Sequence, residues 1–206
     1  MPRAPVRKPI QERAQQRRAS LLDATARVLD AGGYDALTTN AVALEAGASI
    51  GTVYQYFPSR EDLLAGLLDR HRRRLQAAID AAIGEVGDDP LAVADRTVDA
   101  FAEVWRHEPG YRAAWTATQA QRLLARTGDE WSARFTGRIV ARLQSIVPAW
   151  GPAEARLVAT TAVHLVSGLL LVAMTHGPRT EARLVAETKL ALRAYLAARL
   201  TAVHGR

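Results

Sequence analysis

Residues 38–64 read TTNAVALEAGASIGTVYQYFPSREDLL, and this stretch decides the fold of the 206-residue chain. Thr38 or Thr39 is suited to cap a helix and Gly47 to end one, which predicts a short helix between them. Ser49 is suited to cap a second short helix, IGTVYQYF, which the following proline ends. The stretch therefore predicts two short helices joined by a tight turn that contains glycine.

The same stretch contains GASIG, residues 47–51, which matches the G-x-S-x-G pattern of a serine-hydrolase nucleophile elbow. An elbow requires a buried strand before the serine, whereas the residues before Ser49 follow a helical pattern. Asp129 and His164 follow in the order of a catalytic triad, but no sheet is predicted to bring them to the serine. We therefore expect no enzyme and assign no catalytic residue.

Helical periodicity continues on both sides of this stretch. Residues 20–33, SLLDATARVLDAGG, place their apolar side chains on one helix face, and the two glycines are expected to end that helix. Ser59 and Asp62 resemble a capping box that starts a long amphipathic helix. Its expected buried stripe consists of Leu64, Leu67, Leu68, His71, Leu75, Ile79 and Ile83.

Longer helices are expected in the remaining chain. Their approximate ranges are 91–107, a shorter segment after Pro109 and Gly110, 129–147, 153–176 and 180–203. We find no convincing strand and no internal repeat. The sequence therefore predicts an all-α fold of about nine helices, with a three-helix N-terminal unit and a larger C-terminal helical bundle.

Composition and charge narrow the function. The chain has no cysteine, and its five histidines lack metal-ligand spacing, so neither a metal nor a cofactor is expected. No apolar leader is visible at the N-terminus, which predicts a cytoplasmic protein. Residues 1–20 hold six basic residues and one acidic residue, a net charge of +5. Such a basic arm either reaches along DNA phosphates or is a solvated tail.

Residues 157–175, LVATTAVHLVSGLLLVAMT, contain no charged residue and just reach the length of a membrane span. His164, Ser167 and the threonines are costly in lipid, however, and Glu154 and Arg156 lie close by. A helix that is apolar all round also occurs in a buried core or at a subunit interface. Burial is the favoured interpretation, and no membrane partner is expected.

Two helices around a glycine-containing turn are the layout of a helix-turn-helix DNA reader, although any two short helices joined in this way would look similar. Small side chains at Ser49, Gly51 and Thr52 would allow the helix start to approach the major groove, and its amides attract phosphate. Tyr54, Gln55 and Tyr56 carry hydroxyl and amide groups for phosphates or base edges. Arg60 is suited to bind the DNA backbone.

The stretch resembles the DNA-binding segment of TetR-type (tetracycline-repressor-like) transcriptional regulators. The elements of the family pattern fall on Thr38 and Thr39, Val42 and Ala43, Ala46 and Gly47, Ser49 to Thr52, Val53 and Tyr54, Tyr56 and Phe57, Ser59 to Glu61, and Leu63. Ala48 stands where a bulkier aliphatic residue is common, and Arg60 replaces the usual lysine. Chain length and the run of helices agree with the family, whereas the C-terminal part resembles it only in helix layout.

The resemblance implies a division of the chain and a set of DNA contacts. Residues 1–19 would be a flexible basic arm, 20–58 the helix-turn-helix DNA-binding domain, and 59–206 the ligand-binding and dimerisation domain. Phosphate contacts are expected from Thr39, Ser49, Tyr54, Tyr56 and Arg60. Base contacts are expected from Ile50, Gly51, Thr52 and Gln55, with Ile50 able to touch a thymine methyl.

By the same resemblance the chain forms a homodimer through its last two helices and binds a near-palindromic double-stranded DNA operator. A small-molecule effector would enter the C-terminal bundle, displace the long fourth helix and release the DNA, so that the protein acts as a repressor. The candidate pocket residues are Trp105, His107, Tyr111, Trp115, Gln119, Trp131, Phe135, His164 and Met174. Plain core packing is the alternative for each aromatic residue, and a core or interface position is the alternative for His164.

Overall fold

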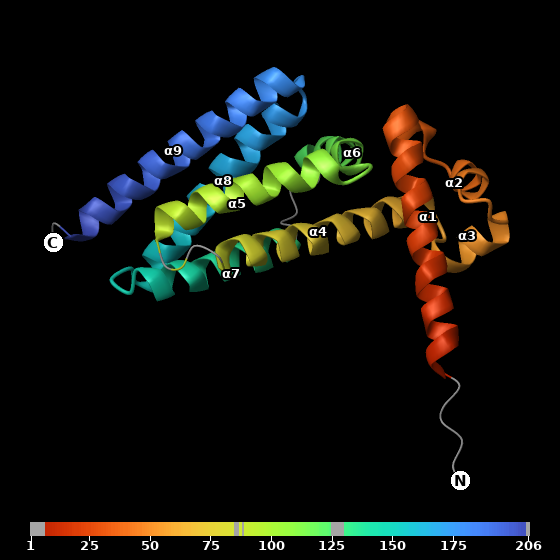
Figure 1. The fold of residues 1–206 in the computed structure, drawn as a ribbon, viewed down its shortest axis with the longest axis horizontal. Coiled ribbons are helices and arrows are strands. Elements are labelled where there is room, and N and C mark those ends of the chain that lie inside the picture. Colours follow the sequence, from red (N-terminus) through yellow and green to blue (C-terminus); the bar gives the residue numbers. More distant parts are fainter. Residues whose placement is uncertain (1–6, 85–86, 88, 125–129, 205–206) are drawn as a thin grey trace, which may run out of the picture. The chain divides into compact units, whose positions relative to one another are not determined.

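A computed structural model of the chain describes the backbone of residues 7–84, 87, 89–124 and 130–204, and the side chains of residues 11–82, 84, 87, 89–118 and 133–202. These residues form nine helices and no strand, as predicted (Figure 1). The helices are α1 (Arg7–Ala36), α2 (Thr39–Glu45), α3 (Ile50–Tyr56), α4 (Arg60–Gly84), α5 (Pro90–His107), α6 (Tyr111–Leu124), α7 (Glu130–Ile146), α8 (Pro152–Met174) and α9 (Pro178–His204).

The helices pack into two compact units. The first comprises residues 1–74 and 105–125, and the second comprises residues 75–104 and 126–206. The first unit therefore contains α1, α2, α3, α4 up to Arg74, the last three residues of α5, and α6. The second contains the rest of α4, most of α5, and α7, α8 and α9. The domain boundaries expected from the sequence remain predictions, but packing places α6 with the helix-turn-helix segment rather than with the C-terminal bundle.

Every helix of the first unit contributes buried apolar side chains to its core. The most buried of these are Leu21, Leu22 and Leu29 of α1, Val42 of α2, Val53 of α3, and Leu63 and Leu67 of α4, each no more than 1% exposed. Ala114 contributes the contact from α6. Burying a side chain of this size stabilises a fold by about 1.5–3 kcal/mol, so Val53, the buried residue of the seven-residue α3, anchors that helix in the core.

Helix α1 is longer than the sequence interpretation allowed. Residues 7–19 were expected to belong to a flexible arm, but they form the first turns of α1. Pro9 is compatible with this helix because it lies in the first turn, where its missing N–H leaves no bond unmade. The residues after it, QERAQQRRAS, are mostly strong helix formers. The arm prediction is therefore wrong for residues 7–19, and residues 1–6 lie outside the described part of the chain.

Two glycines with positive φ shape α1 and the turn that packs on it. Gly33 has φ 67° and ψ −166°, which are not helical values, so the regular helix is interrupted at the glycine pair, as predicted, and a further short turn extends α1 to Ala36. Gly110, at φ 73°, forms the turn before α6. Its N–H donates to Asp30 Oδ2 at 2.8 Å, and a Cβ placed on it would lie 2.8 Å from Ala26 Cα. The turn before α6 therefore packs directly on the backbone of α1.

In the second unit α9 packs on α8, and α8 packs on α7. Ion pairs join α5 and α8 to α9: Arg193 lies 2.6 Å from Asp95, Lys189 pairs with Asp99, and Arg199 pairs with Glu154. Helix α8 is long and apolar enough to cross a membrane, with a mean hydropathy of 2.1 in its most apolar window. Only 28% of that window is buried, so the expected burial is incomplete within a single chain.

Candidate nucleic-acid interface

The turn between α2 and α3 is built as the sequence indicated. Gly47 adopts φ 57°, a left-handed conformation that suits glycine, and the Ala48 N–H donates to Ala43 O at 2.9 Å. The Ser49 hydroxyl then accepts the Thr52 N–H at 3.1 Å, which confirms Ser49 as the cap of α3. Together these contacts fix the point at which α3 leaves the turn.

The cap of α2 is Thr38 rather than Thr39. The Thr38 hydroxyl accepts the Ala41 N–H at 3.0 Å. The side chain of Thr39 is therefore not needed for the cap. Its hydroxyl donates to the Tyr54 hydroxyl at 3.4 Å and so links α2 to α3. Two of the predicted phosphate contacts are therefore neighbours in the fold.

The outer face of α3 is exposed. Ile50 is 38% exposed and Tyr54 52%, although both are large and partly apolar. Gly51 and Gln55 are exposed beside them. A Cβ on Gly51 would meet only the Ser49 hydroxyl, at an ordinary 3.8 Å, so nothing inside the chain requires glycine there. The missing side chain leaves the backbone of α3 accessible from outside.

Arg60 is exposed at the start of α4 and is held by two residues that sequence reasoning did not find. Its Nε donates to Glu61 Oε1 at 3.0 Å, and its guanidinium lies over the Tyr34 ring, 4.8 Å from the centroid. The hydrogen bond between them raises the pKa of Arg60 and lowers the pKa of Glu61. Tyr34 lies 26 residues before Arg60, and no periodicity connects the two positions.

The start of α4 is capped as predicted. The Ser59 hydroxyl accepts the Asp62 N–H at 3.1 Å and donates to Asp62 Oδ2 at 2.7 Å. This arrangement differs from a standard capping box, in which the acidic side chain reaches the backbone N–H of the cap residue. It still fixes the first turn of α4, so the position of Arg60 relative to α3 is set by local bonds.

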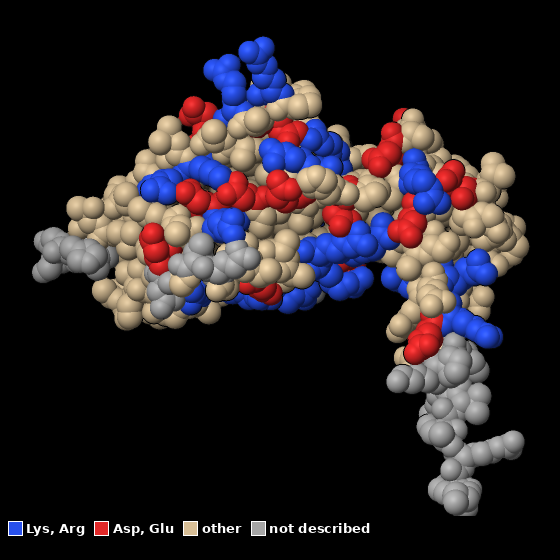
Figure 2. Space-filling model, viewed as in Figure 1, with Lys and Arg blue, Asp and Glu red and all other residues tan. Residues whose placement is uncertain are grey.

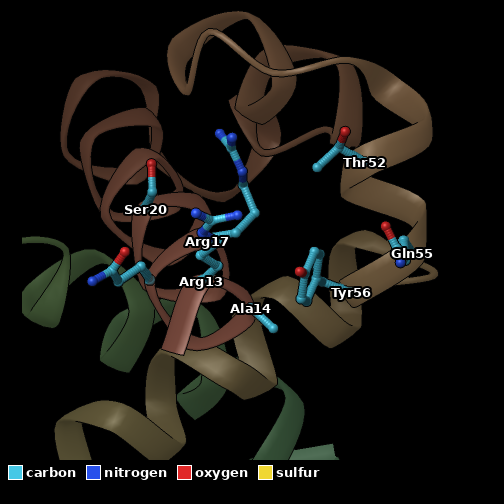
Figure 3. A pocket seen from close by; sticks show the side chains of 8 residues that line it. Arg13, Ala14, Arg17, Ser20, Thr52, Gln55 and Tyr56 are labelled. Carbon is cyan, nitrogen blue, oxygen red and sulfur yellow. The ribbon is translucent and has the colours of Figure 1, made fainter. Parts of the chain in front are cut away.

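A hollow of about 630 Å³ separates α1 from α3 (Figure 3). Helix α3 lines it with Thr52, Gln55 and Tyr56, and α1 lines it with Arg13, Ala14, Gln16, Arg17 and Ser20. Figure 2 shows basic side chains gathered over the N-terminal part of α1 and beside α3. The sequence indicated that the basic residues 1–20 could reach along DNA phosphates, but it did not place any of them beside α3. The two arginines are four residues apart and share a helix face once α1 extends to residue 7.

The candidate pocket residues are divided between the two units. In the first unit Trp105 and Tyr111 are buried, Trp115 is half-buried, and His107 is exposed. In the second unit Phe135 and Met174 are buried, whereas His164 is exposed and its Nδ1 lies 2.8 Å from Thr160 O. The side chains of Gln119 and Trp131 lie outside the described part of the structure.

The ring of His71, on α4, lies against the aromatic residues of α6. The ring centroids of His71 and Tyr111 are 5.0 Å apart, and those of Tyr111 and Trp115 are 6.2 Å apart in a stacked arrangement. His71 is 2% exposed, as its place in the predicted stripe implies, and its Nε2 lies 3.1 Å from Pro109 O. Burial lowers the pKa of His71 to about 4, and the positive charges of Arg70 and Arg74 act in the same direction.

Known proteins match the two parts of the chain separately. Residues 21–67 match the family described as "Bacterial regulatory proteins, tetR family", and residues 89–196 match "Tetracyclin repressor-like, C-terminal domain". The second match alone covers more than half of the chain. The chain belongs to the TetR family. As a TetR-family protein it is a DNA-binding transcriptional regulator, and the helix-turn-helix segment is its DNA-binding part.

Individual TetR-family relatives agree with this assignment. The chain is 42% identical over 71 residues to the transcriptional repressor KstR of Mycolicibacterium smegmatis, a match that covers 34% of this chain and 35% of that one. The match thus spans only about a third of the length of KstR. The transcriptional regulator BetI of Burkholderia thailandensis is 30% identical over 159 residues, covering 75% of this chain and 80% of BetI.

Solved structures extend the likeness to the whole TetR-family fold. A TetR-family transcriptional regulator from Streptomyces coelicolor is 28% identical, with a TM-score of 0.69, and covers 88% of this chain and 98% of its own. A putative regulator from Pseudomonas aeruginosa is 24% identical, with a TM-score of 0.62 over 87% of this chain and 91% of its own. At this identity the second likeness shows the fold alone.

Proposed function

We propose that this TetR-family regulator is a repressor that binds a near-palindromic operator as a homodimer and leaves it when a small molecule occupies the C-terminal part of the chain. The observation that carries the proposal is the exposed face of α3. The helix is anchored by Val53 and capped by Ser49, yet it presents Ile50, Gly51 and Tyr54 outward, where the chain itself gives them little to contact.

The exposed groups suggest a role for each position. Tyr54 and Thr39, whose hydroxyls lie 3.4 Å apart, form a pair that binds a backbone phosphate, with Ser49, Tyr56 and Arg60 as further phosphate ligands. Ile50, Gly51, Thr52 and Gln55 face the base edges. Gln55 offers the donor and acceptor that recognise adenine, and Ile50 offers an apolar contact for a thymine methyl.

The C-terminal helices support a homodimer. Leu157 and Val172 of α8 and Leu190 of α9 are 56%, 46% and 62% exposed in the single chain. Large apolar side chains gathered on two neighbouring helices are typical of a protein interface. A second copy of α8 and α9 packed against them would cover the uncharged segment 157–175. The two recognition helices of a dimer then meet two half-sites, roughly 34–36 Å apart on the DNA.

An effector acts on such a dimer only if it binds the DNA-free conformation more tightly than the DNA-bound one. The candidate contacts in the first unit are Trp105, His107, Tyr111, Trp115 and Gln119. Those in the second are Trp131, Phe135, His164 and Met174. Helix α4 belongs to both units, since the division between them falls after Arg74. A shift of α4 is therefore the proposed route by which an effector changes the position of α3.

The test is a footprint on the DNA that flanks the gene of this protein, with the dimer checked by light scattering. Wild-type protein should protect a near-palindrome. Tyr54→Ala should abolish protection while the dimer is kept, and Tyr54→Phe, which removes only the hydroxyl, should weaken binding by about tenfold or more, because a hydrogen bond to a charged group contributes about 1.5–3 kcal/mol. Unchanged protection by the alanine variant would remove α3 from the DNA interface.

The apolar character of α8 supports membrane attachment as a second candidate. Purification without detergent distinguishes the repressor proposal from membrane attachment. A dimer that stays in the aqueous phase is expected from the repressor proposal and also from a cytoplasmic location. Partition of the intact chain into lipid vesicles would instead support a membrane role for α8.

A further inference from the structure

The hollow between α1 and α3 carries an inference that deepens the proposed function and rests on it. Of the eight residues that line it, all but Ala14 carry polar groups, and two are arginines. Arg13 and Arg17 are four residues apart on one face of α1, and in Figure 3 their side chains extend between Ser20 and the α3 residues. The hollow is therefore cationic on the α1 side and rich in hydrogen-bonding groups on the α3 side.

The two arginines differ from several other arginines of the same unit, which pair with carboxylates. Arg27 pairs with Glu45 at 2.5 Å, and Arg70 pairs with Asp23 at 2.5 Å. Among the described residues Arg13 and Arg17 have no ion-pair partner, and both are exposed. Two unneutralised guanidinium groups on one face form a site that matches an anion, since each can bind phosphate oxygens through two N–H groups.

The neighbouring residues indicate which anion. A small-molecule site of this volume is usually lined mostly by apolar and aromatic residues, whereas seven of the eight residues that line this hollow carry a polar group and none is a large aliphatic residue. Its α3 wall is formed by Thr52, Gln55 and Tyr56, which lie on the same helix as the exposed Ile50 and Tyr54. DNA seated on α3 would bring its phosphate backbone to the edges of that helix, and α1 lies along one of them.

The two arginines of the site also lie outside the segment that matches the DNA-binding family model. The match to the DNA-binding family model begins at residue 21, so Arg13 and Arg17 belong to the part of α1 that precedes it. We infer that this N-terminal extension of α1 is a second DNA-binding element: Arg13 and Arg17 bind a backbone phosphate that enters the hollow beside Thr52, Gln55 and Tyr56. The element adds affinity without reading sequence, because phosphates are the same at every base pair.

The experiment compares the salt dependence of DNA binding in wild-type protein and in Arg13→Gln/Arg17→Gln. Each phosphate contact contributes about 0.9 to the slope of log K against log salt. A dimer that loses its contact with one phosphate in each subunit should therefore lose roughly 1.8 from the slope. Between 50 and 200 mM salt, wild-type affinity should then fall on the order of 10-fold more than the affinity of the variant. Operator and unrelated DNA should show the same loss.

A matched control removes the same charge elsewhere. Arg73→Gln/Arg138→Gln neutralises two exposed arginines that already pair with Asp69 and Asp80. This control should keep the wild-type slope. A control with the same slope loss as Arg13→Gln/Arg17→Gln would show that net charge alone is responsible, and the phosphate site would be rejected. Circular dichroism confirms that both variants fold, which is expected because glutamine is a good helix former.

Phosphate ethylation interference locates the contact. Wild-type protein should be sensitive to ethylation at a phosphate in each half-site, and the Arg13→Gln/Arg17→Gln variant should be insensitive at that phosphate only. If both proteins show the same interference pattern while Tyr54→Ala loses its footprint, the repressor proposal stands and the α1 site is wrong. If wild-type protein protects no DNA at all, the proposed function itself fails. Binding of inorganic phosphate without any change on DNA would also overturn the inference.

Discussion

Gly51 shows how a single residue separates the requirements of folding from those of binding. Its backbone is helical, and a Cβ there would touch only the Ser49 hydroxyl at 3.8 Å. Glycine inside a helix costs about 1 kcal/mol relative to alanine, so this position is unfavourable for the fold on its own. We therefore expect that glycine at this position serves the close approach of DNA to the backbone of α3.

Gly51→Ala is expected to raise the free energy of unfolding by up to about 1 kcal/mol and to weaken operator binding. The first effect follows from helix propensity, and the second from the methyl group placed between α3 and the DNA. Urea denaturation and a gel shift measure the two quantities on the same preparation. A variant that is more stable and binds DNA as well as wild type would show that the backbone of α3 does not approach the groove at this point.

His71 illustrates a buried group whose charge state affects stability. It is neutral in the fold, with a pKa of about 4 compared with 6.5 for an unperturbed histidine. The unfolded chain thus binds a proton between these two pH values that the folded chain does not bind. The stability that neutral His71 provides is present above pH 6.5, falls as the pH drops toward 4, and is fully lost below it.

The free energy of unfolding should fall between pH 7 and pH 5, with a total loss attributable to His71 of up to about 3 kcal/mol once pH 4 is reached. Few carboxylates titrate above pH 5, which keeps that window specific for histidine. Denaturation at a series of pH values measures the slope, and His71→Phe serves as the comparison. Equal slopes for the two proteins would mean that His71 is not the group responsible.

At the scale of elements, the short helices were predictable and their long-range partners were not. Thr38, Ser49 and Ser59 act through residues three positions away, so the sequence alone indicates where α2, α3 and α4 begin. The contact of Arg60 with Tyr34 joins positions that no local pattern relates. The start of α1 was missed because a run of basic residues was interpreted as a flexible arm, although the same residues are good helix formers.

The turn before α6 is the element whose packing tolerates least change. Gly110 has a positive φ, and a Cβ there would lie 2.8 Å from Ala26 Cα and 2.9 Å from Ala26 Cβ. Gly110→Ala should therefore destabilise the protein by about 1–3 kcal/mol, since it adds backbone strain and a clash with α1. Thermal denaturation measures the loss. Gly137→Ala is a suitable control, because a Cβ at that position meets nothing within 4 Å; equal effects of the two substitutions would contradict the close packing.

For the whole molecule, the all-α fold and the helix order follow from periodicity, but the grouping of helices does not. The sequence places α6 in the C-terminal part of the chain, and only three-dimensional packing assigns it to the unit that contains α3. Likewise the segment 157–175 is visibly apolar, yet the sequence does not reveal that less than a third of its most apolar window is covered within one chain. Both facts depend on contacts between distant segments, which local patterns do not encode.

The exposed apolar residues of α8 and α9 predict that a second copy of the chain covers them in a dimer. Leu157→Glu/Leu190→Glu places two charges on side chains that are more than half exposed in one chain. Within the proposed interface these charges would be buried without partners, so the dimer should dissociate and operator affinity should fall with it. Sedimentation at several protein concentrations gives the dimer Kd. A variant that remains a dimer and binds DNA normally would place the interface on another surface.

The placement of α6 also matters to anyone who exchanges parts between regulators. A sensor assembled by joining the first 74 residues of this chain to a foreign effector domain would lack Gly110 and Ala114, which close the surface of α1. This hybrid protein would expose the apolar surface of α1 to water, and it would fold poorly. The transferable module is discontinuous: it requires residues 105–124 as well, spliced back through whatever sequence replaces the segment between.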